Sequence, residues 1–304
     1  MAKTVRETIK KIVHHHLTVE KRLCFGQCLT AVGWVGGTLP ELYEDDGMIE
    51  LTTADVANGG FVVGAGLKGI RPIYVVRYQG FQWFNSPIII NYAAKSKEIW
   101  GIPCPIFIRS IAMEGGMGPV AGSSHHSIYY RMPGIKIISP MTPKEYKYAY
   151  EKFMMEDDVY YVSEHRGSYD NSTELSDIAI DNCDIVLFPI SITRFEAEKA
   201  RLKLIDKGIK TSVFHQLWIK PFNIKEQWLA TTKKSKYGGL VLDDDYQDGV
   251  SKSIAHKLMI KTGKNIHTLG LDDKTAGFYD KVDNLPPNAD KIVRKVLEII
   301  QSME

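Results

Sequence analysis

Cysteine is scarce in this chain. Four of its 304 residues are cysteines, and no two of them have the CxxC spacing of zinc and redox sites. Small secreted domains held together by disulfides carry a much higher density of cysteine. We therefore expect a cytoplasmic protein whose four thiols are reduced packing residues: Cys24, Cys28, Cys104 and Cys183.

Long apolar runs and an excess of one charge are also missing. Apolar runs such as residues 87–90 are far shorter than the ~20 residues that a membrane-spanning helix needs. The opening MAKTVRETIKK lacks the apolar core of a signal peptide. The chain has 38 basic and 36 acidic residues, without a basic cluster. We expect neither a membrane nor a nucleic acid as its partner.

Two short tracts resemble metal ligands but have simpler interpretations. His14-His15-His16 lies in a polar segment with a helical pattern, which favours a solvated helix face. Asp243-Asp244-Asp245 follows a strand-like run, and its surroundings lack the wider ligand pattern of a calcium loop. We interpret this second tract as a solvated loop. The sequence predicts no metal ligands in this chain.

The chain does have a regular alternation of strand-like and helix-like segments, which is typical of an α/β fold with a mainly parallel sheet. In the first half we expect a loop at 33–37, a short helix opening at Thr38, strands at 22–25, 73–76, 106–111, 135–138 and 159–162, and helices at 4–17, 61–67, 87–100 and 142–155. In the second half we expect strands at 185–190, 211–217 and 239–242, and helices at 193–207, 248–261 and 289–303.

A polar stretch without periodicity, residues 167–182, separates two such α/β regions. A chain of 304 residues is long enough for two substantial cores. The sequence therefore predicts two domains, residues 1–170 and 183–304. Residues 115–124, rich in glycine, proline and serine, are expected to form a flexible loop.

Several segments, taken in order, resemble one family. They begin with Asp55, an expected glycine-rich turn at Gly59-Gly60, Gly69 and Arg71-Pro72. Then come Asn91-Tyr92-Ala93-Ala94-Lys95, the PGIKIISP run at 133–140, Glu164-His165-Arg166 and finally Lys220-Pro221-Phe222-Asn223. This order over the full length resembles the β subunit of the 2-oxo acid dehydrogenase E1 component, with the C-terminal half of transketolase a near relative. The resemblance implies a parallel-sheet pyrimidine-binding domain followed by a transketolase C-terminal domain.

The same resemblance implies a shared cofactor, thiamine diphosphate with Mg²⁺. In the family, one partner holds the diphosphate and Mg²⁺ through a GDG motif, and the other supplies the pyrimidine pocket. This chain has no GDG motif, and Asp248-Gly249 lacks the preceding glycine. The resemblance thus implies an α-type partner subunit, in an α2β2 heterotetramer or a related assembly.

Asp55 occupies the place of the glutamate that, in the family, hydrogen-bonds the pyrimidine ring and thereby activates the cofactor. Aspartate is shorter than glutamate by one CH₂ group, roughly 1.5 Å of reach. A closer backbone or a bridging water could offset that loss, although a misplacement of about 1 Å can cost on the order of 10²-fold in rate. The simpler interpretation of Asp55 is a helix N-cap, and both interpretations can hold together.

An aromatic wall is expected beside the pyrimidine. Phe81 is the first candidate because it falls in the ungapped block, Tyr78 is the second, and Trp83 and Phe84 complete the set. Each of them could equally be an ordinary core or interface aromatic.

The largest departure from the family lies in residues 118–127. A substrate-facing histidine is usual in this loop, yet the E1 β spacing counted back from Pro133 places Ala121 there. The transketolase spacing instead favours His125, with His126 beside it. Gln27-Cys28 also stands where the E1 β family usually has an acidic pair. Polar surface is the simpler interpretation of the histidine pair.

Three functions are consistent with this resemblance. An E1-type subunit would decarboxylate a 2-oxo acid and pass the acyl unit to a lipoyl acyltransferase. A split transketolase-type subunit would transfer a ketol or acyl unit between carbonyl compounds without a lipoyl partner. A non-catalytic scaffold or regulatory subunit would keep the fold but not the chemistry, as Asp55 and Ala121 together could indicate.

Overall fold

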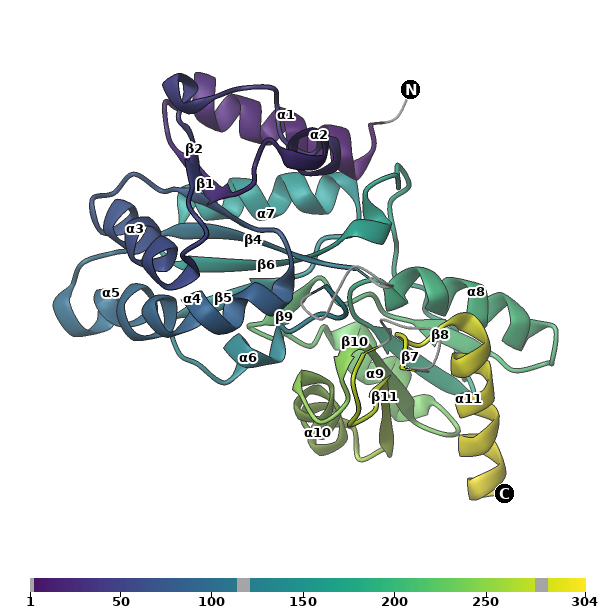
Figure 1. Ribbon diagram of the computed structural model, residues 1–304. Coiled ribbons are helices and arrows are strands. Elements are labelled where there is room, and N and C mark those ends of the chain that lie inside the picture. The colour runs from purple at the N-terminus through teal and green to yellow at the C-terminus, as the bar shows by residue number, and fades with distance from the viewer. Residues whose placement is uncertain (1–2, 114–120, 277–283) are drawn as a thin grey trace. The chain divides into compact units, whose positions relative to one another are not determined.

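The computed structural model of the chain describes residues 3–113, 121–276 and 284–304. These residues form two compact units, one up to Glu174 and the other from Leu175 onward. Both units place helices on parallel strands (Figure 1), which confirms the expected α/β class. The domain bounds 1–170 and 183–304 stay a prediction. No helix in the described residues is both long and apolar enough to cross a membrane.

The strands of the first unit lie in the order β2-β1-β3-β4-β6-β5, and all neighbouring pairs are parallel. After β1 the chain places β2 on one side, and it then returns to place β3 on the other. The carboxyl ends of β1 and β3 therefore flank the point where the strand order reverses. The bounds are β1 (Cys24–Gln27), β2 (Met48–Leu51), β3 (Ile73–Val76), β4 (Ile106–Ala112), β5 (Ile135–Ile138) and β6 (Val159–His165).

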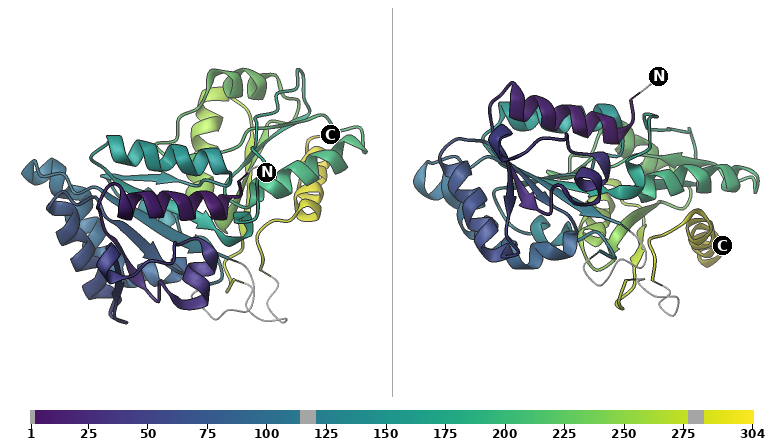
Figure 2. Two further views of the ribbon diagram at one scale, coloured as in Figure 1. Left: turned by 90° about the horizontal axis from the view of Figure 1, so that it is seen from above. Right: turned by 45° about the horizontal axis from the view of Figure 1, so that its top comes forward.

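Helices cover both faces of this sheet. Helices α1 (Val5–Thr18) and α7 (Pro143–Met155) run side by side on one face, as the left view of Figure 2 shows. On the other face lie α3 (Asp55–Leu67), α4 (Gln82–Ile88) and α5 (Ala94–Trp100) (Figure 1). Shorter elements are α2 (Ala31–Gly37), α6 (Ser127–Tyr130), the 3₁₀ turns η1 (Glu44–Asp46), η2 (Gln79–Phe81) and η4 (Arg166–Ser168), and the wide, π-helical turn η3 (Ile89–Ala93).

Helix α3 begins at Asp55, six residues before the expected start at Phe61. The sequence suggested a turn at Gly59-Gly60, but both glycines lie inside the helix. A Cβ atom on Gly59 would lie 3.2 Å from the Asn85 side chain, and one on Gly66 would lie 2.7 Å from the Cys104 sulfur. These glycines therefore serve close packing of α3 against its neighbours rather than a change of direction.

The helix expected from Pro87 to Trp100 begins five residues earlier, at Gln82. Proline is common at the first position of a helix, which made Pro87 resemble a start. In the structure Pro87 lies inside α4, and the wide turn η3 follows it before α5. A proline inside a helix removes one backbone donor, and a local change of helix type accommodates that loss.

The segment after β1 differs from its expected form. Residues 32–36, which overlap the loop expected at 33–37, form a turn with left-handed backbone, with φ between 51° and 64°. The short helix expected to open at Thr38 is absent from the described residues 38–43, and the next helical turn is η1. The Thr38 hydroxyl instead donates to the Val35 carbonyl, closing the preceding turn.

The second unit is a parallel sheet of order β11-β10-β7-β8. Alternate residues of β7 and β10 pack with helices α8 and α11 in one core, which includes Leu187, Leu242, Ala200 and Ile292. Elements α9, β9 and β11 were not expected. The bounds are β7 (Ile185–Pro189), α8 (Thr193–Ile205), β8 (Thr211–Val213), β9 (Trp218–Lys220), α9 (Glu226–Lys234), β10 (Gly239–Tyr246), α10 (Val250–Thr262), β11 (Ile266–Leu271) and α11 (Ala289–Met303).

Three expectations about polar residues are wrong. Asp243-Asp244-Asp245 is buried at the end of β10 rather than in a solvated loop, and Asp244 accepts a 2.8 Å hydrogen bond from Ser191. His16 is fully buried, so the histidine tract is not wholly a solvated face. Cys28 is exposed and is therefore not a packing residue, whereas Cys24, Cys104 and Cys183 are buried. In each case neighbouring elements, which the local pattern does not reveal, decide the burial.

A buried ion pair links the adjacent strands β4 and β6 of the first unit. The Arg109 guanidinium on β4 donates to Glu164 on β6 at 2.8 and 3.0 Å, and the two side chains are 0% and 1% exposed. Tyr146 and Tyr169 donate their hydroxyls to the same carboxylate, and Arg109 also donates to Thr38. Burial works against the charge of Arg109, but the adjacent Glu164 carboxylate raises the arginine pKa well above its usual value.

Removing one partner of this pair would leave an uncompensated charge in the core. We expect Arg109→Met or Glu164→Gln to lower the free energy of unfolding by about 3–5 kcal/mol, measured by urea denaturation. Lys199→Met is the matched control because it breaks an exposed pair with Glu196, whose side chains are 64% and 25% exposed. That change should cost about 1 kcal/mol or less. Equal losses in core and control variants would contradict the role given to the buried pair.

Burial lowers the pKa of His16 from 6.5 to about 3. Below pH 6.5 the His16 imidazole is protonated in the unfolded chain, whereas in the folded chain it stays neutral down to about pH 3. His16 should thus destabilise the fold as the pH falls through this window, by at most about 1.4 kcal/mol per pH unit. Urea denaturation at several pH values should show a flatter profile for His16→Phe than for the wild type, whereas the exposed-site control His14→Gln should keep the wild-type slope. Identical slopes in all three proteins would exclude His16 as the source.

Candidate functional site

A cavity of about 230 Å³ opens at the carboxyl ends of β1 and β3, where the strand order of the first unit reverses. Ligands of open α/β sheets bind in such crevices because several strand ends and loops converge there. The lining comes from the end of β1, the start of α3, strand β3 and the turn after it. The lining residues are Gln27, Cys28, Thr53, Asp55, Tyr74, Val75, Val76, Arg77, Tyr78 and Phe81.

Asp55 lies at the first position of α3, and its carboxylate lines the cavity. Gln27 at the end of β1 donates its side-chain amide to Asp55 Oδ1 at 2.9 Å. The N-cap residue of this helix is Ala54, which makes no side-chain cap, so the N-cap interpretation of Asp55 is wrong. The carboxylate is thus held from β1 at the lining of the cavity.

The cavity has an aromatic wall and a buried phenol. Tyr78 and Phe81 both line it, with ring centroids 5.8 Å apart and planes tilted by 43°. Tyr74 on β3 is 2% exposed, and its hydroxyl accepts a hydrogen bond from Asn85. Burial, followed by the nearby charge of Asp55, raises the pKa of Tyr74 above its usual value. Its hydroxyl therefore stays protonated at neutral pH and can act as a neutral donor.

Phe84 lies apart from this wall. Its side chain is 52% exposed on α4, next to Trp83 at 60%, and it is absent from the described lining of the cavity. The role expected for Phe84 in binding a cofactor stays a prediction.

His125 and His126 are tied to the same edge of the sheet, although neither is among the residues that line the cavity. The backbone amide of His125 donates to Gln79 Oε1 at 2.6 Å. Gln79, fully buried, donates in turn to the carbonyl of Ser110 and the hydroxyl of Ser163, and His126 Nδ1 lies 3.2 Å from that hydroxyl. Ala121 is buried, and residues 115–120 of the expected loop lie outside the described residues.

Sequence reasoning thus singled out three of the residues that the cavity brings together: Asp55, Tyr78 and Phe81. It assigned Tyr74 only to a buried strand, and it predicted no role for Arg77 or Gln79. Gln27 was noted only as a departure from an acidic pair. The signal available for these residues was their place directly at the ends of predicted strands, where parallel sheets gather functional side chains.

The chain matches the family model described as transketolase, pyrimidine binding domain, over residues 6–171. It is 26% identical over 238 residues to the 2-oxoisovalerate dehydrogenase subunit beta of Bacillus subtilis (strain 168), with 71% of each chain covered. It is 23% identical over 260 residues to the pyruvate dehydrogenase E1 component subunit beta of the same organism, with 79% of each chain covered.

Among solved structures, the chain is similar to a split gene transketolase described as an inactive beta4 tetramer. The TM-score is 0.74, the sequence identity is 15%, and the match covers 99% of both chains. At this identity the likeness bears on the fold alone. Together these findings confirm the resemblance to E1 β subunits and transketolases, of which this chain is a divergent relative.

Cys28 offers a direct probe of the cavity, because it is the one exposed thiol of the four and lies in the lining. We expect iodoacetamide to modify Cys28 in the folded protein while the three buried cysteines react only after unfolding. Peptide mass spectrometry after brief alkylation would measure this difference. Cys28→Ser should then show no rapid labelling, and rapid labelling of Cys104 or Cys24 in the native protein would contradict the packing described here.

Proposed function

The chain belongs to the transketolase pyrimidine-binding-domain family, and on that premise we propose that it is the β-type subunit of a thiamine diphosphate-dependent enzyme. The enzyme acts on a 2-oxo acid or a ketose and works only when an α-type subunit is bound. The observation that carries this proposal is the meeting of Asp55, Tyr78 and Phe81 around one cavity at the switch point of the sheet.

The residues of the cavity fit the pyrimidine end of this cofactor. A whole small-molecule site usually has a volume of about 300–1,000 Å³, whereas this cavity measures about 230 Å³. It suits one flat ring with a hydrogen-bond donor better than a complete cofactor. The diphosphate and Mg²⁺ are then held mainly by the α-type subunit, in keeping with the lack of a GDG motif in this chain.

Asp55 would accept a hydrogen bond from a ring nitrogen of the bound pyrimidine. Gln27 engages Oδ1, which fixes the carboxylate and leaves Oδ2 for the ring. The walls of Tyr78 and Phe81 would orient the ring and keep water from it. When bound, thiamine diphosphate supplies a carbon nucleophile that adds to a substrate carbonyl. Because aspartate is short, the ring must approach the start of α3 more closely than it would a glutamate.

The histidine pair is proposed to serve the substrate side of the same edge. Gln79 and Ser163 hold His125 and His126 from two directions, so their positions are set by the ends of β3 and β6. His125 contacts the exposed ring of Trp83 edge-on, with centroids 6.1 Å apart. A proton held on either imidazole could be given to or taken from a carbonyl substrate.

Two of the relatives support a proposal for the reaction type. They are beta subunits of 2-oxo acid dehydrogenases, which favours decarboxylation with transfer of an acyl unit to a lipoyl acyltransferase in an α2β2 assembly. Transfer of a ketol unit without a lipoyl partner is the second candidate. A non-catalytic subunit that keeps the fold is the third, and it is favoured by the absence of both histidines from the described lining of the cavity.

The test is a calorimetric titration of thiamine diphosphate and Mg²⁺ into this chain, alone and co-expressed with an α-type subunit. We expect binding only in the co-expressed sample, since each chain supplies half of the site. Within that complex, Asp55→Ala should lower the turnover of 2-oxo acids by on the order of 10²-fold or more while the complex still assembles.

Two variants sharpen this test. Asp55→Asn keeps the size of the side chain but loses its charge, so a loss equal to that of Asp55→Ala assigns the effect to the carboxylate. Glu44→Gln, an exposed change in η1 outside the cavity, is the control and should leave turnover unchanged. Binding without turnover in the wild-type complex would favour the non-catalytic subunit over the enzyme. Turnover unaffected by Asp55→Ala would instead refute the activating role proposed for Asp55.

A further inference from the structure

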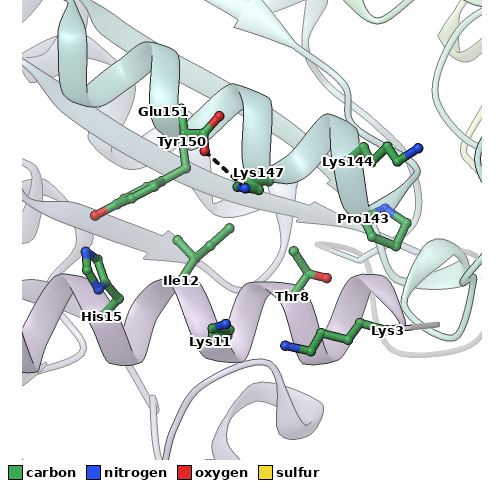
Figure 3. A pocket seen from close by; sticks show the side chains of 10 residues that line it. All are labelled: Lys3, Thr8, Lys11, Ile12, His15, Pro143, Lys144, Lys147, Tyr150 and Glu151. Carbon is green, nitrogen blue, oxygen red and sulfur yellow. Dashed lines mark ion pairs between the residues drawn. The ribbon is translucent and has the colours of Figure 1, made fainter. Parts of the chain in front are cut away.

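A second cavity, of about 500 Å³, lies between helices α1 and α7 of the first unit, and we call it the α1–α7 groove. Figure 3 shows Thr8, Ile12 and His15 projecting from α1 toward α7, and Tyr150 projecting from α7 back toward α1. None of its lining residues belongs to the cavity of Asp55. The lining is Lys3, Thr8, Lys11, Ile12, His15, Pro143, Lys144, Lys147, Tyr150 and Glu151.

The groove carries an excess of positive charge. Four lysines line it against a single carboxylate, and that carboxylate, Glu151, is paired with Lys147 at 3.5 Å, as the dashed line in Figure 3 marks. Lys3, Lys11 and Lys144 form no ion pair with any residue in the described ranges. These three exposed lysines are therefore available to meet the charge of a bound anion.

The walls of the groove are apolar. Ile12 is half-buried, Pro143 lies at the first position of α7, and Tyr150 is 7% exposed. The Tyr150 hydroxyl lies 2.9 Å from Nδ1 of the buried His16, so the polar end of this side chain is engaged in the interior. What it adds to the groove is its ring, which can pack against a flat apolar group.

We propose that the α1–α7 groove binds a small organic phosphate that has a flat apolar body. The uncompensated ammonium groups of Lys3, Lys11 and Lys144 meet the phosphates, and the ring of Tyr150 with Ile12 packs against the body. Lysine suits phosphate as a point charge. A volume of about 500 Å³ falls within the ~300–1,000 Å³ of small-molecule sites, which favours such a ligand over an extended acidic peptide.

The test uses the full chain and three probes: ATP, inorganic tripolyphosphate and adenosine, each titrated calorimetrically at about 0.15 M ionic strength. ATP should bind at least about tenfold more tightly than either of its halves, because only ATP uses both the cations and the apolar wall. Equal affinity for tripolyphosphate and ATP would overturn the proposal, since charge alone would then explain binding. No heat with ATP would overturn it as well.

The double variant Lys11→Gln/Lys144→Gln should weaken ATP binding by on the order of tenfold or more, because two charge-assisted contacts are lost. Lys233→Gln/Lys234→Gln removes the same charge from two exposed lysines of α9 and is the matched control. Equal weakening of ATP binding in both double variants would indicate a non-specific effect of net charge and would refute the proposal.

This site is independent of the proposed cofactor site, so the two can fail separately. ATP binding should be the same in Asp55→Ala as in the wild type, and an excess of thiamine diphosphate should not displace ATP. Displacement by thiamine diphosphate, or loss of ATP binding in Asp55→Ala, would place the nucleotide in the cavity of Asp55 and refute the groove as its site.

Discussion

The ion pair between Arg109 and Glu164 is the interaction on which the first unit depends. It joins β4 to β6 inside the core, and three further groups converge on it, the hydroxyls of Tyr146, Tyr169 and Thr38. A buried charge pair is tolerated only where its geometry and hydrogen bonds are satisfied. This requirement fixes how the two strands lie against each other, and with them everything placed at their carboxyl ends.

The residues at those ends show the consequence. Ser110 and Ser163 pair in register one residue beyond Arg109 on β4 and one residue before Glu164 on β6. Both accept hydrogen bonds from Gln79, and Gln79 anchors the backbone of His125. Hydrogen bonds therefore connect the core to the candidate site through Ser110 and Ser163, which bind Gln79, and through Gln79, which binds His125. On the other side of the switch point, Gln27 fixes Asp55 from the end of β1, so both parts of the site are held by strand ends rather than by loops alone.

Local patterns in the sequence were sufficient for regular elements with strong periodicity. Helix α11 spans Ala289–Met303, the range expected from its apolar spacing, and strand β3 has its expected bounds. The expectation failed where packing overrides local preference. Gly59-Gly60 resembled a turn, yet both lie in α3, where Asn85 packs closely against Gly59. Asp243-Asp244-Asp245 resembled a solvated loop, yet it continues a buried strand.

The sequence by itself determined the α/β class, the family and the identity of three cavity residues, because those follow from periodicity and from the order of motifs along the chain. Only the tertiary structure decided that Gln27 holds Asp55, that Tyr74 lines the same cavity, and that lysines from α1 and α7 share one groove. The groove residues of α7 follow those of α1 by at least 128 positions in the chain. No local pattern links them, since only packing on a common sheet face brings the two helices together.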